Sequence, residues 1–323
     1  MSQFAFFFPG QGSQSVGMMS GFGDNPVIKQ TFVEASDILG VDFWAMATEP
    51  NELLNLTQHT QPLMLVADIA TWRAYLNQST NSETANQPTI FAGHSLGEYA
   101  ALVAAGSISF ADALPLVKYR AEVMQSAVPE GIGAMAAILG LDDDIVRAVC
   151  IEAAQNEAGI NEAGNEVCEP VNFNSPGQVV IAGNKAAVER GMEIAKAKGA
   201  KRALALPVSV PSHCALMKPA AEKLAQYLAN VTVNAPQIPV IHNADVTSYV
   251  TADEIKQALV RQLYSPVRWV ESVQAIHAKG VLTAAECGPG KVLTGLTKRI
   301  VAELSCNALV SNEAIVEFSS SNK

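Results

Sequence analysis

The sequence contains no apolar run that approaches the roughly 18 residues needed for a membrane-spanning helix. Its apolar N-terminal stretch, "FAFFF", covers only residues 4–8, follows no basic segment and ends at Pro9-Gly10. Such a stretch is too short and wrongly flanked to be a signal peptide. We therefore expect a buried core strand there, and no association with a membrane.

Cysteine is scarce and irregularly spaced. The chain has five cysteines, an odd number, and they form no C-x-x-C pair. They are Cys150, Cys168, Cys214, Cys287 and Cys306. This pattern predicts a cytoplasmic protein with reduced thiols and no structural metal.

Charge is also low, because charged residues make up only 16% of the chain. Acidic residues outnumber basic ones by 31 to 21, and the net charge of −10 argues against nucleic acid as a partner. Residues 184–202 differ, since they hold six cations and two acids. These cations are Lys185, Arg190, Lys196, Lys198, Lys201 and Arg202. Two interpretations stay open for them: a solvated helix face, or a docking patch for an acidic partner.

The chain contains neither internal repeats nor a long low-complexity linker. Its 323 residues, of which 49% are hydrophobic, are enough for one large and one smaller domain with an ample core. Short apolar runs typical of strands, at residues 3–8, 88–94, 238–243 and 281–288, alternate with helical stretches. This alternation predicts an α/β fold whose mostly parallel sheet carries helices on both faces.

The middle of the chain has a different order of elements. Residues 133–140 are typical of a strand and residues 142–155 of a helix. Two further strands joined at Ser175-Pro176-Gly177 then precede a second helix and a last strand. The order β-α-β-β-α-β is that of a ferredoxin-like unit. We therefore expect an inserted ferredoxin-like small domain at residues 130–207, with an exposed loop at 156–166.

The remaining residues are expected to form one large catalytic domain in two pieces, 1–129 and 208–310. Its first piece contains Gly93-His94-Ser95-Leu96-Gly97, where a strand pattern gives way to a helical one. A G-x-S-x-G sequence at such a join is the nucleophile elbow of α/β-hydrolase folds, so we expect an α/β-hydrolase-like domain. The polar tail at residues 311–323 is a candidate for disorder.

The elbow makes Ser95 the candidate nucleophile, held with a strained backbone and an exposed hydroxyl. The amide of Leu96 lies at the start of the following helix, where backbone donors are unpaired, and is a candidate oxyanion donor. The glycine-rich loop at residues 8–17 is neither a dinucleotide fingerprint nor a P-loop. It can supply a second oxyanion donor, for which Gln11 is the candidate.

A serine nucleophile needs a base, and the chain has five histidines. His94 is a poor candidate, because neighbouring side chains at a strand end point to opposite sides. His59 and His277 fall at helix ends without a clear link to the elbow. His213 follows a strand and opens a helix, where active-site groups collect, and is favoured over His242, which ends a strand and remains a rival.

Arg120 lies within an apolar helical stripe, four residues from both Leu116 and Met124. A buried guanidinium is costly unless it has an anion. Two interpretations remain open on the pattern alone. The anion is either an internal carboxylate such as Glu98, or the carboxylate of a substrate held by two hydrogen bonds.

Motifs spread from residue 8 to residue 296 together resemble the malonyl-CoA:acyl carrier protein transacylases of dissociated fatty-acid synthesis. They are "FPGQGSQ", "TQP", "GHSLGEYAAL", "VKYRAEVMQ", "PVNFNSPGQVVIAG", "VPSHCALM", "QLYSPVRW" and "GPGKVLTGL". The resemblance implies Ser95 as nucleophile, His213 as base and Arg120 as the clamp on the malonyl carboxylate. It also implies the amides of Gln11 and Leu96 as the oxyanion hole.

The same resemblance implies two roles for glutamines. Gln262 matches the position whose main-chain carbonyl orients the histidine, and Gln61 matches a glutamine of the substrate pocket. The implied activity is ping-pong transfer of a malonyl group from malonyl-CoA to acyl carrier protein, without a cofactor or metal. The residues 184–202 are then a plausible contact for the acidic carrier protein. Alternatives are a serine thioesterase or esterase, or a transacylase for another extender such as methylmalonyl.

Overall fold

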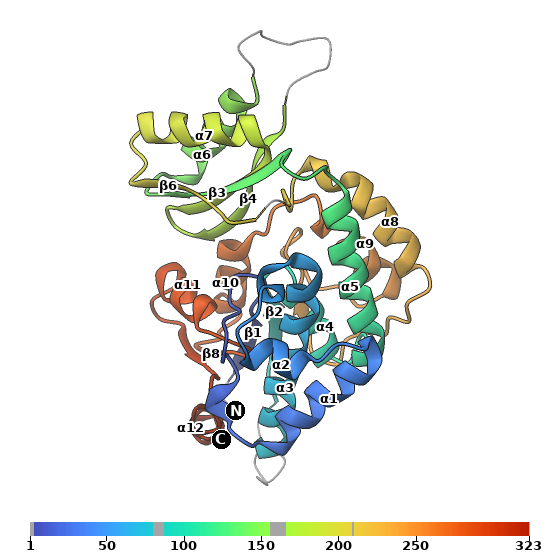
Figure 1. The fold of residues 1–323 in the computed structure, drawn as a ribbon. Coiled ribbons are helices and arrows are strands. Elements are labelled where there is room, and N and C mark those ends of the chain that lie inside the picture. The colour runs from blue at the N-terminus through green and yellow to red at the C-terminus, as the bar shows by residue number, and fades with distance from the viewer. Residues whose placement is uncertain (1–2, 80–86, 156–165, 209, 323) are drawn as a thin grey trace.

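The computed structural model describes residues 3–79, 87–155, 166–208 and 210–322. These residues form a five-stranded sheet, here called sheet A, and a four-stranded sheet, sheet B. Figure 1 shows sheet B and its two helices at one end of the molecule, above a larger body built around sheet A. The two chain ends lie together at the opposite end.

Sheet A is parallel throughout and has the strand order β7-β2-β1-β8-β9. Its strands are β1 (Phe4–Phe8), β2 (Ile90–Gly93), β7 (Val240–Ile241), β8 (Thr283–Glu286) and β9 (Ser305–Ala308). Every residue of β1 is buried, as the run "FAFFF" predicts. The expectation of a mostly parallel sheet in an α/β fold is confirmed.

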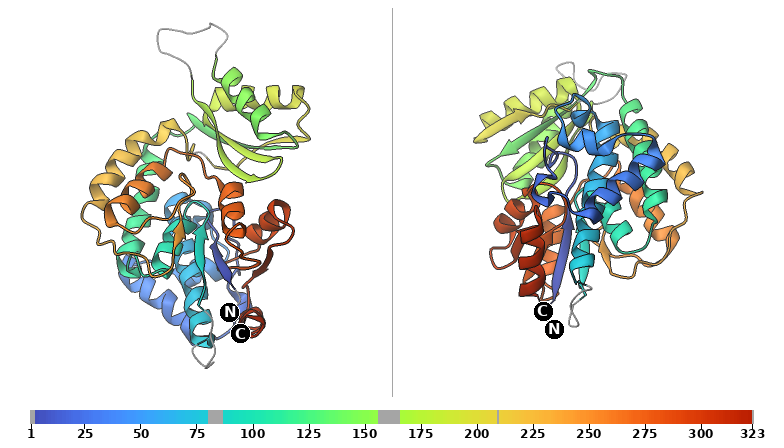
Figure 2. Two further views of the ribbon diagram at one scale, coloured as in Figure 1. Left: turned by 180° about the vertical axis from the view of Figure 1, so that it is seen from behind. Right: turned by 60° about the horizontal axis from the view of Figure 1, so that its bottom comes forward.

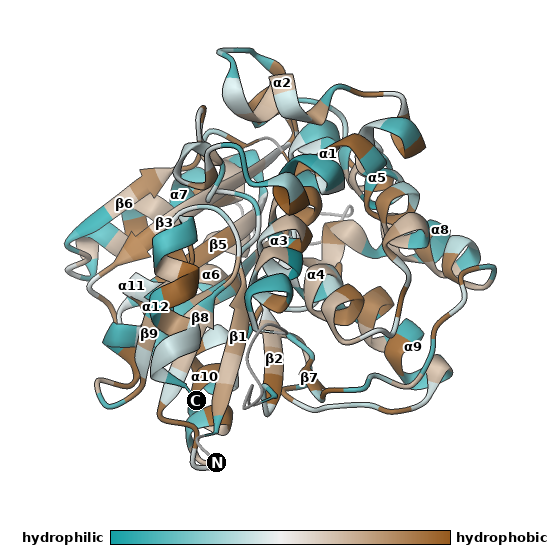
Figure 3. Cartoon of the chain, turned by 90° about the horizontal axis from the view of Figure 1, so that it is seen from below, coloured by the Kyte–Doolittle hydropathy of each residue, from teal (hydrophilic) through white to brown (hydrophobic). Residues whose placement is uncertain are grey.

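Helices cover both faces of sheet A because β1 is apolar on both sides. Phe4, Phe6 and Phe8 face one core, while Ala5 and Phe7 face another. The first core is formed with α1 (Pro26–Leu39), α2 (Phe43–Thr48), α3 (Thr57–Ser79), α4 (Gly97–Ala104), α5 (Phe110–Ser126), α8 (Lys218–Leu228), α9 (Ala252–Gln262) and α12 (Asn312–Ser321). The second is formed with α10 (Trp269–His277) and α11 (Val292–Ile300). Figure 3 shows the apolar strand β1 between these helix layers.

Sheet B is antiparallel, with the strand order β4-β5-β3-β6. Its elements follow in the order β3 (Gly133–Leu139), α6 (Asp143–Ala154), β4 (Cys168–Ser175), β5 (Gln178–Asn184), α7 (Lys185–Ala197) and β6 (Arg202–Ala205). Figure 2 shows both helices on the side away from the larger body. The other side contacts Cys214, the residue after His213. Sheet B therefore packs against the segment that carries His213. Short 3₁₀ segments occur at Ser20–Phe22, Leu53–Asn55 and Ala215–Met217.

Sheet B is tied to the larger body by main-chain hydrogen bonds. The amide of Phe173 in β4 donates to the carbonyl of Val267, and the amide of Val267 donates to the carbonyl of Val171, over 3.0 and 2.8 Å. Val267 lies just before α10, whose first residue, Trp269, contacts the ring of His94. The link therefore fixes β4 beside the end of β2.

The expectation of a disordered tail is wrong for residues 312–321, which form α12. Ser311 caps this helix by accepting a hydrogen bond from the amide of Ala314. Ile315 and Phe318 are buried, and the ring of Phe318 contacts the rings of Phe4, Phe6 and Tyr75. Two apolar residues three positions apart are enough to seal the end of the first core. The expected exposed loop at 156–166 lies almost wholly outside the described residues.

None of the described helices has the length and apolar character that crossing a membrane requires. Among the described residues there is also no group of three or more histidine, cysteine, aspartate or glutamate side chains placed to hold a metal.

Candidate active site

The turn at Ser95 leaves no room for side chains at Gly93 and Gly97. Ser95 joins β2 to α4 with a φ of 53°, in the left-handed region that a non-glycine residue rarely adopts. A Cβ placed on Gly93 would lie 1.9 Å from the carbonyl carbon of Gly97, and one on Gly97 would lie 2.0 Å from the carbonyl oxygen of Phe8. Neither position has room for a side chain, so the sharp turn depends on both glycines.

His213 is the histidine that reaches Ser95. Its Nε2 lies 2.7 Å from Ser95 Oγ, and its Nδ1 lies 2.7 Å from the main-chain oxygen of Gln262. A carbonyl oxygen can only accept, so Nδ1 carries the proton and Nε2 is free to accept one from the serine. His213 also has a left-handed backbone, with a φ of 66°, and its amide donates to the carbonyl of Leu263.

The end of α9 supplies the acceptor for His213. The carbonyls of the last helical turn have no partner within their helix, and Gln262 is the last residue of α9. Burial, and then the positive charge of Arg120, lower the pKa of His213 to about 3. The imidazole is therefore neutral near pH 7, the form that a base requires.

His242, the rival histidine, is occupied elsewhere. Its Nδ1 lies 2.7 Å from Oε1 of Glu98, and both side chains are buried. His94 has a different partner, since its Nε2 lies 2.8 Å from Oδ1 of Asn174 in β4. His59 and His277 are half-buried on other parts of the surface. The structure thus brings one of the five histidines to Ser95.

Arg120 extends from α5 to the serine. Its Nη2 lies 3.4 Å from Ser95 Oγ and 3.0 Å from Oε1 of Gln262, and its Nη1 lies 2.7 Å from Oε1 of Gln61. The side chain is 1% exposed, and burial lowers its pKa. Its Nε has no hydrogen-bond partner within the described part of the chain.

Glu98, the internal anion considered for Arg120, does not pair with it. The Glu98 carboxylate accepts hydrogen bonds from Nδ1 of His242, the amide of Asn243 and Nε2 of Gln262, over 2.7, 2.9 and 2.9 Å. No carboxylate of the described residues lies within ion-pair distance of Arg120. Among the described residues the buried cation therefore has no direct anionic partner, and Glu98 acts on it only from a distance.

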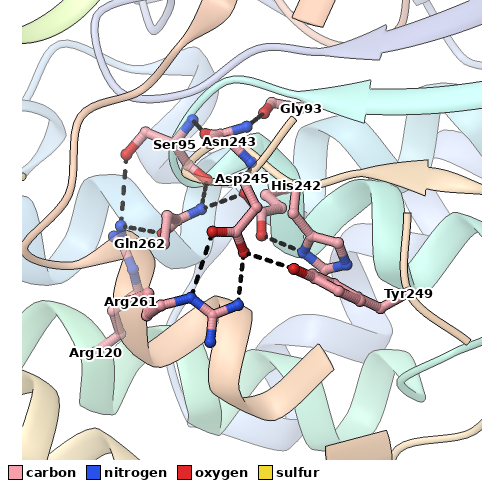
Figure 4. A network of polar contacts seen from close by, with 10 residues as sticks. Gly93, Ser95, Arg120, His242, Asn243, Asp245, Tyr249, Arg261 and Gln262 are labelled. Carbon is pink, nitrogen blue, oxygen red and sulfur yellow. Dashed lines mark hydrogen bonds and ion pairs between the residues drawn. The ribbon is translucent and has the colours of Figure 1, made fainter. Parts of the chain in front are cut away.

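Two side chains that the sequence does not single out for this purpose hold the elbow (Figure 4). Asn243, just after β7, accepts from the amide of Ser95 over 2.7 Å and donates to the carbonyl of Gly93 over 2.6 Å. The side chain of Gln262 donates to the carbonyl of Ser95 over 2.9 Å. An Asn at a strand end and a Gln at a helix end give no sequence signal, because their contacts depend on how β7 and α9 pack.

A second contact joins the two segments that carry Asn243 and Gln262 (Figure 4). Arg261, next to Gln262, forms an ion pair with Asp245 over 2.6 Å, and the hydroxyl of Tyr249 donates to the same carboxylate. Asp245 lies two residues after Asn243. The segment after β7 and the end of α9 are therefore joined to each other as well as to the elbow.

The loop that carries Gln11, one expected oxyanion donor, lies against the elbow that carries Leu96, the other. A Cβ placed on Gly10 would lie 3.5 Å from the amide nitrogen of Leu96 and 2.4 Å from the carbonyl oxygen of His94. The loop after β1 therefore runs against the elbow, with Gln11 as its next residue. Among the described residues, the amides of Gln11 and Leu96 have no hydrogen-bond partner. A serine in contact with a neutral histidine, next to a helix start whose first amide is free, is an arrangement suited to acyl transfer.

The cations of residues 184–202 divide into two groups. Arg190, Lys196 and Lys198 form ion pairs with acidic residues, at distances of 2.5 to 3.0 Å. Lys185, Lys201 and Arg202 form none within the described part of the chain. These three lie at the start of α7, just before β6 and at the start of β6.

Comparison with known proteins gives consistent matches over nearly the whole chain. The family model described as "Acyl transferase domain" matches residues 5–316. A "Malonyl CoA-acyl carrier protein transacylase" of Salmonella typhimurium is 56% identical over 311 residues, which cover 96% of this chain and 96% of that protein.

Solved structures agree with these matches. An acyl-carrier-protein S-malonyltransferase from Burkholderia pseudomallei has a TM-score of 0.92 and 55% identity, covering 98% of this chain and 99% of the other. A malonyl-transacylase in complex with a type II PKS acyl-carrier protein has a TM-score of 0.93 and 51% identity, covering 99% of this chain and 100% of the other.

Proposed function

The chain belongs to the acyl transferase family, among its malonyl-CoA:acyl carrier protein transacylases, and we propose that it transfers a malonyl group from malonyl-CoA to the phosphopantetheine thiol of acyl carrier protein. This reaction supplies malonyl units to fatty-acid biosynthesis. The enzyme is an acyltransferase, and the details of its mechanism follow from the groups around Ser95.

The observation that carries the proposal is the buried Arg120 beside the nucleophile, without an anionic partner. A guanidinium held 3.4 Å from Ser95 Oγ can bind an acyl group whose far end is a carboxylate. Acetyl groups lack that carboxylate and leave the buried charge unpaired, which a site of this kind penalises. The arrangement therefore favours malonyl over acetyl thioesters.

In the first half-reaction, Ser95 Oγ attacks the thioester carbonyl of malonyl-CoA while Nε2 of His213 takes its proton. The bond from Oγ to carbon forms, and the negative charge on the carbonyl oxygen is stabilised by the amides of Gln11 and Leu96. Loss of one such donor typically costs on the order of 10²–10³ in rate. The carbon–sulfur bond then breaks, and His213 returns the proton to the CoA sulfur.

In the second half-reaction, the thiol of the carrier protein gives its proton to His213 and attacks the malonyl-serine ester. The bond to Ser95 breaks and the serine recovers the proton. The main-chain oxygen of Gln262 keeps Nδ1 of His213 protonated throughout, so one nitrogen serves both steps. No step requires a cofactor or metal, and their absence from the reaction stays a prediction.

Incubation with malonyl-CoA, without carrier protein, tests this assignment by intact mass. We expect one malonyl adduct on the wild-type chain and none on Ser95→Ala. On Arg120→Ala we expect a loss of acylation on the order of 10²-fold or more, because the buried ion pair between Arg120 and the malonyl carboxylate is removed. Release of CoA and free malonate without an adduct would indicate a thioesterase. Equal labelling by methylmalonyl-CoA would indicate a broader extender range.

We propose that the carrier protein binds near Lys185, Lys201 and Arg202. The support is their freedom from ion pairs in the described residues, in contrast with Arg190 and Lys196. Lys201→Glu should raise the KM for carrier protein and leave acylation by malonyl-CoA unchanged. Lys196→Glu is the matched control, since it reverses a charge already paired with Glu193. Equal effects of the two variants would refute the docking site.

We further propose that residues 130–207 form an inserted ferredoxin-like domain, and that residues 1–129 and 208–310 form an α/β-hydrolase-like catalytic domain. The support for the first is the element order β-α-β-β-α-β around an antiparallel sheet. The support for the second is the serine elbow at the end of a parallel strand. The cytoplasmic location stays a prediction from the cysteine pattern.

A further inference from the structure

The acceptors around Arg120 are all neutral. Its guanidinium contacts Oε1 of Gln61 at 2.7 Å, Oε1 of Gln262 at 3.0 Å and Oγ of Ser95 at 3.4 Å. Its central carbon, Cζ, also lies 5.3 Å from the centroid of the Tyr99 ring. Amide oxygens satisfy N–H donors without neutralising a cation. The side chain is thus fixed in position without a carboxylate in direct contact, and Glu98 acts on its charge only from a distance, raising the pKa of Arg120 less than burial lowers it.

The orientation of the Gln262 amide is set by its neighbours. Its Nε2 donates to Oε2 of Glu98 and to the carbonyl of Ser95, both over 2.9 Å. Each of these groups can only accept, so the nitrogen must face them and Oε1 must face Arg120. Figure 4 shows Gln262 between the arginine and the elbow.

Gln262 therefore separates the buried cation from the nearest buried anion described. Glu98 is itself held by donors from His242 and Asn243 as well as from Gln262. Gln61 completes the arrangement on the other side, where its Nε2 contacts the weakly accepting sulfur of Met124 at 3.8 Å. A carboxylate at either glutamine position would sit directly against Arg120 and pair with it.

We propose that Gln61 and Gln262 are positioning residues that determine the acyl-group selectivity, because they hold Arg120 with neutral oxygens and leave its charge for the carboxylate of the incoming acyl group. This inference rests on the proposed function. It explains why Arg120 is enclosed by amides although Glu98 is nearby. The burial that lowers the pKa of Arg120 is the same cost that a bound carboxylate relieves.

Gln61→Glu tests the inference, because it changes one nitrogen to oxygen and places a charge beside Arg120. We expect the ratio of kcat/KM for malonyl-CoA to that for acetyl-CoA to fall by about tenfold or more. The fall should come from a higher KM for malonyl-CoA and a smaller penalty on acetyl-CoA. Gln61→Met is the matched control, since it removes the hydrogen bond without adding a charge; because Gln262 still holds Arg120, the ratio should fall much less than in Gln61→Glu.

Retention of the preference by Gln61→Glu, or an equal loss in both variants, would overturn the inference. Labelling of Ser95 by a fluorophosphonate probe checks that each variant is folded. If Gln61→Glu does not label, the double variant Glu98→Gln/Gln262→Glu decides. It moves the negative charge from position 98 to position 262, next to Arg120, without changing the number of charges. The ratio of kcat/KM for malonyl-CoA to that for acetyl-CoA should then fall, and an unchanged ratio would refute the inference.

The two levels of the proposal fail in different ways. If wild-type protein forms no malonyl ester, the proposed function is wrong. If wild type forms the ester and prefers malonyl-CoA, but the charged variants keep that preference, only the roles of Gln61 and Gln262 are wrong.

Discussion

Replacing Arg120 with methionine should move the acid limb of Ser95 acylation to higher pH. His213 must be neutral to take the serine proton, and the rate falls when it is protonated. Burial is the larger cause of its pKa of about 3, and the charge of Arg120 is the second. Removing that charge leaves burial and the smaller effect of His94 to oppose protonation of His213.

The structure gives the size of the effect. Nη2 of Arg120 lies 3.4 Å from Ser95 Oγ, which lies 2.7 Å from Nε2 of His213, so the guanidinium is at most about 6 Å from the imidazole. Two unit charges about 6 Å apart interact by about 3 kcal/mol at an effective dielectric constant of about 20, which equals about two pKa units. We therefore expect the pKa of His213 to be about 5 in Arg120→Met.

The assay is the burst of p-nitrophenol from p-nitrophenyl acetate, measured across pH 4–9. This ester is uncharged and does not need Arg120 for binding. The wild-type burst rate should be flat down to about pH 5, while that of Arg120→Met should be about half-maximal there. Circular dichroism at each pH confirms that the fold is retained. Superimposable profiles, or a wild-type midpoint near the ordinary histidine value of 6.5, would refute the reasoning.

Three further predictions concern the support of the site and the stability of the fold. Gly97→Ala should lower Tm by several degrees and abolish labelling by the fluorophosphonate probe, since its Cβ would lie 2.0 Å from a main-chain oxygen of β1. Gly295→Ala in α11, whose Cβ would meet nothing within 4 Å, is the control and should raise Tm. Equal changes of Tm in the two variants would contradict this. Asn243→Ala should lower kcat about tenfold or more with little change in KM, because two hydrogen bonds that hold Ser95 are lost; an unchanged kcat would be inconsistent with that role. Asp68→Asn should raise Tm at pH 8 and not at pH 4, because burial raises the pKa of this carboxyl, which has no hydrogen-bond partner among the described residues. A raised folded-state pKa gives stability that is complete below about pH 4 and is lost as pH rises, by about 1.4 kcal/mol per pH unit while only the unfolded state is ionised; an equal Tm change at both pH values would argue against it.

Much of the fold follows from local patterns. The buried run at residues 4–8, the elbow at Ser95 and the strand–helix order of residues 133–205 are where the sequence predicts them. The strand β9 and the helix α12 are not predicted, because both are short and rich in polar residues. Their stability comes from pairing with β8 and from Phe318 packing against β1, which are contacts between distant parts of the chain.

The site likewise contains residues that the sequence marks and residues that only the structure identifies. Ser95 is marked by the glycines beside it, and Arg120 by its place in an apolar stripe. Position in the sequence alone does not decide between His213 and His242, and it does not identify the partner of Glu98. Both depend on how the ends of β7 and α9 meet beneath the elbow. The orientation of an amide such as that of Gln262 is set by its neighbours in space and leaves no trace in spacing.

The most direct test of the account follows the malonyl group from the enzyme to its acceptor. The malonyl-enzyme is prepared with malonyl-CoA, freed of CoA, and mixed with acyl carrier protein that bears its phosphopantetheine thiol; intact mass then follows both proteins. We expect the adduct to leave Ser95 and appear in full on the carrier protein, while the same malonyl-enzyme without carrier protein stays acylated over that time. Loss of the adduct to free malonate at the same rate with and without carrier protein would contradict the central claim, because water and not a thiol would be the acceptor.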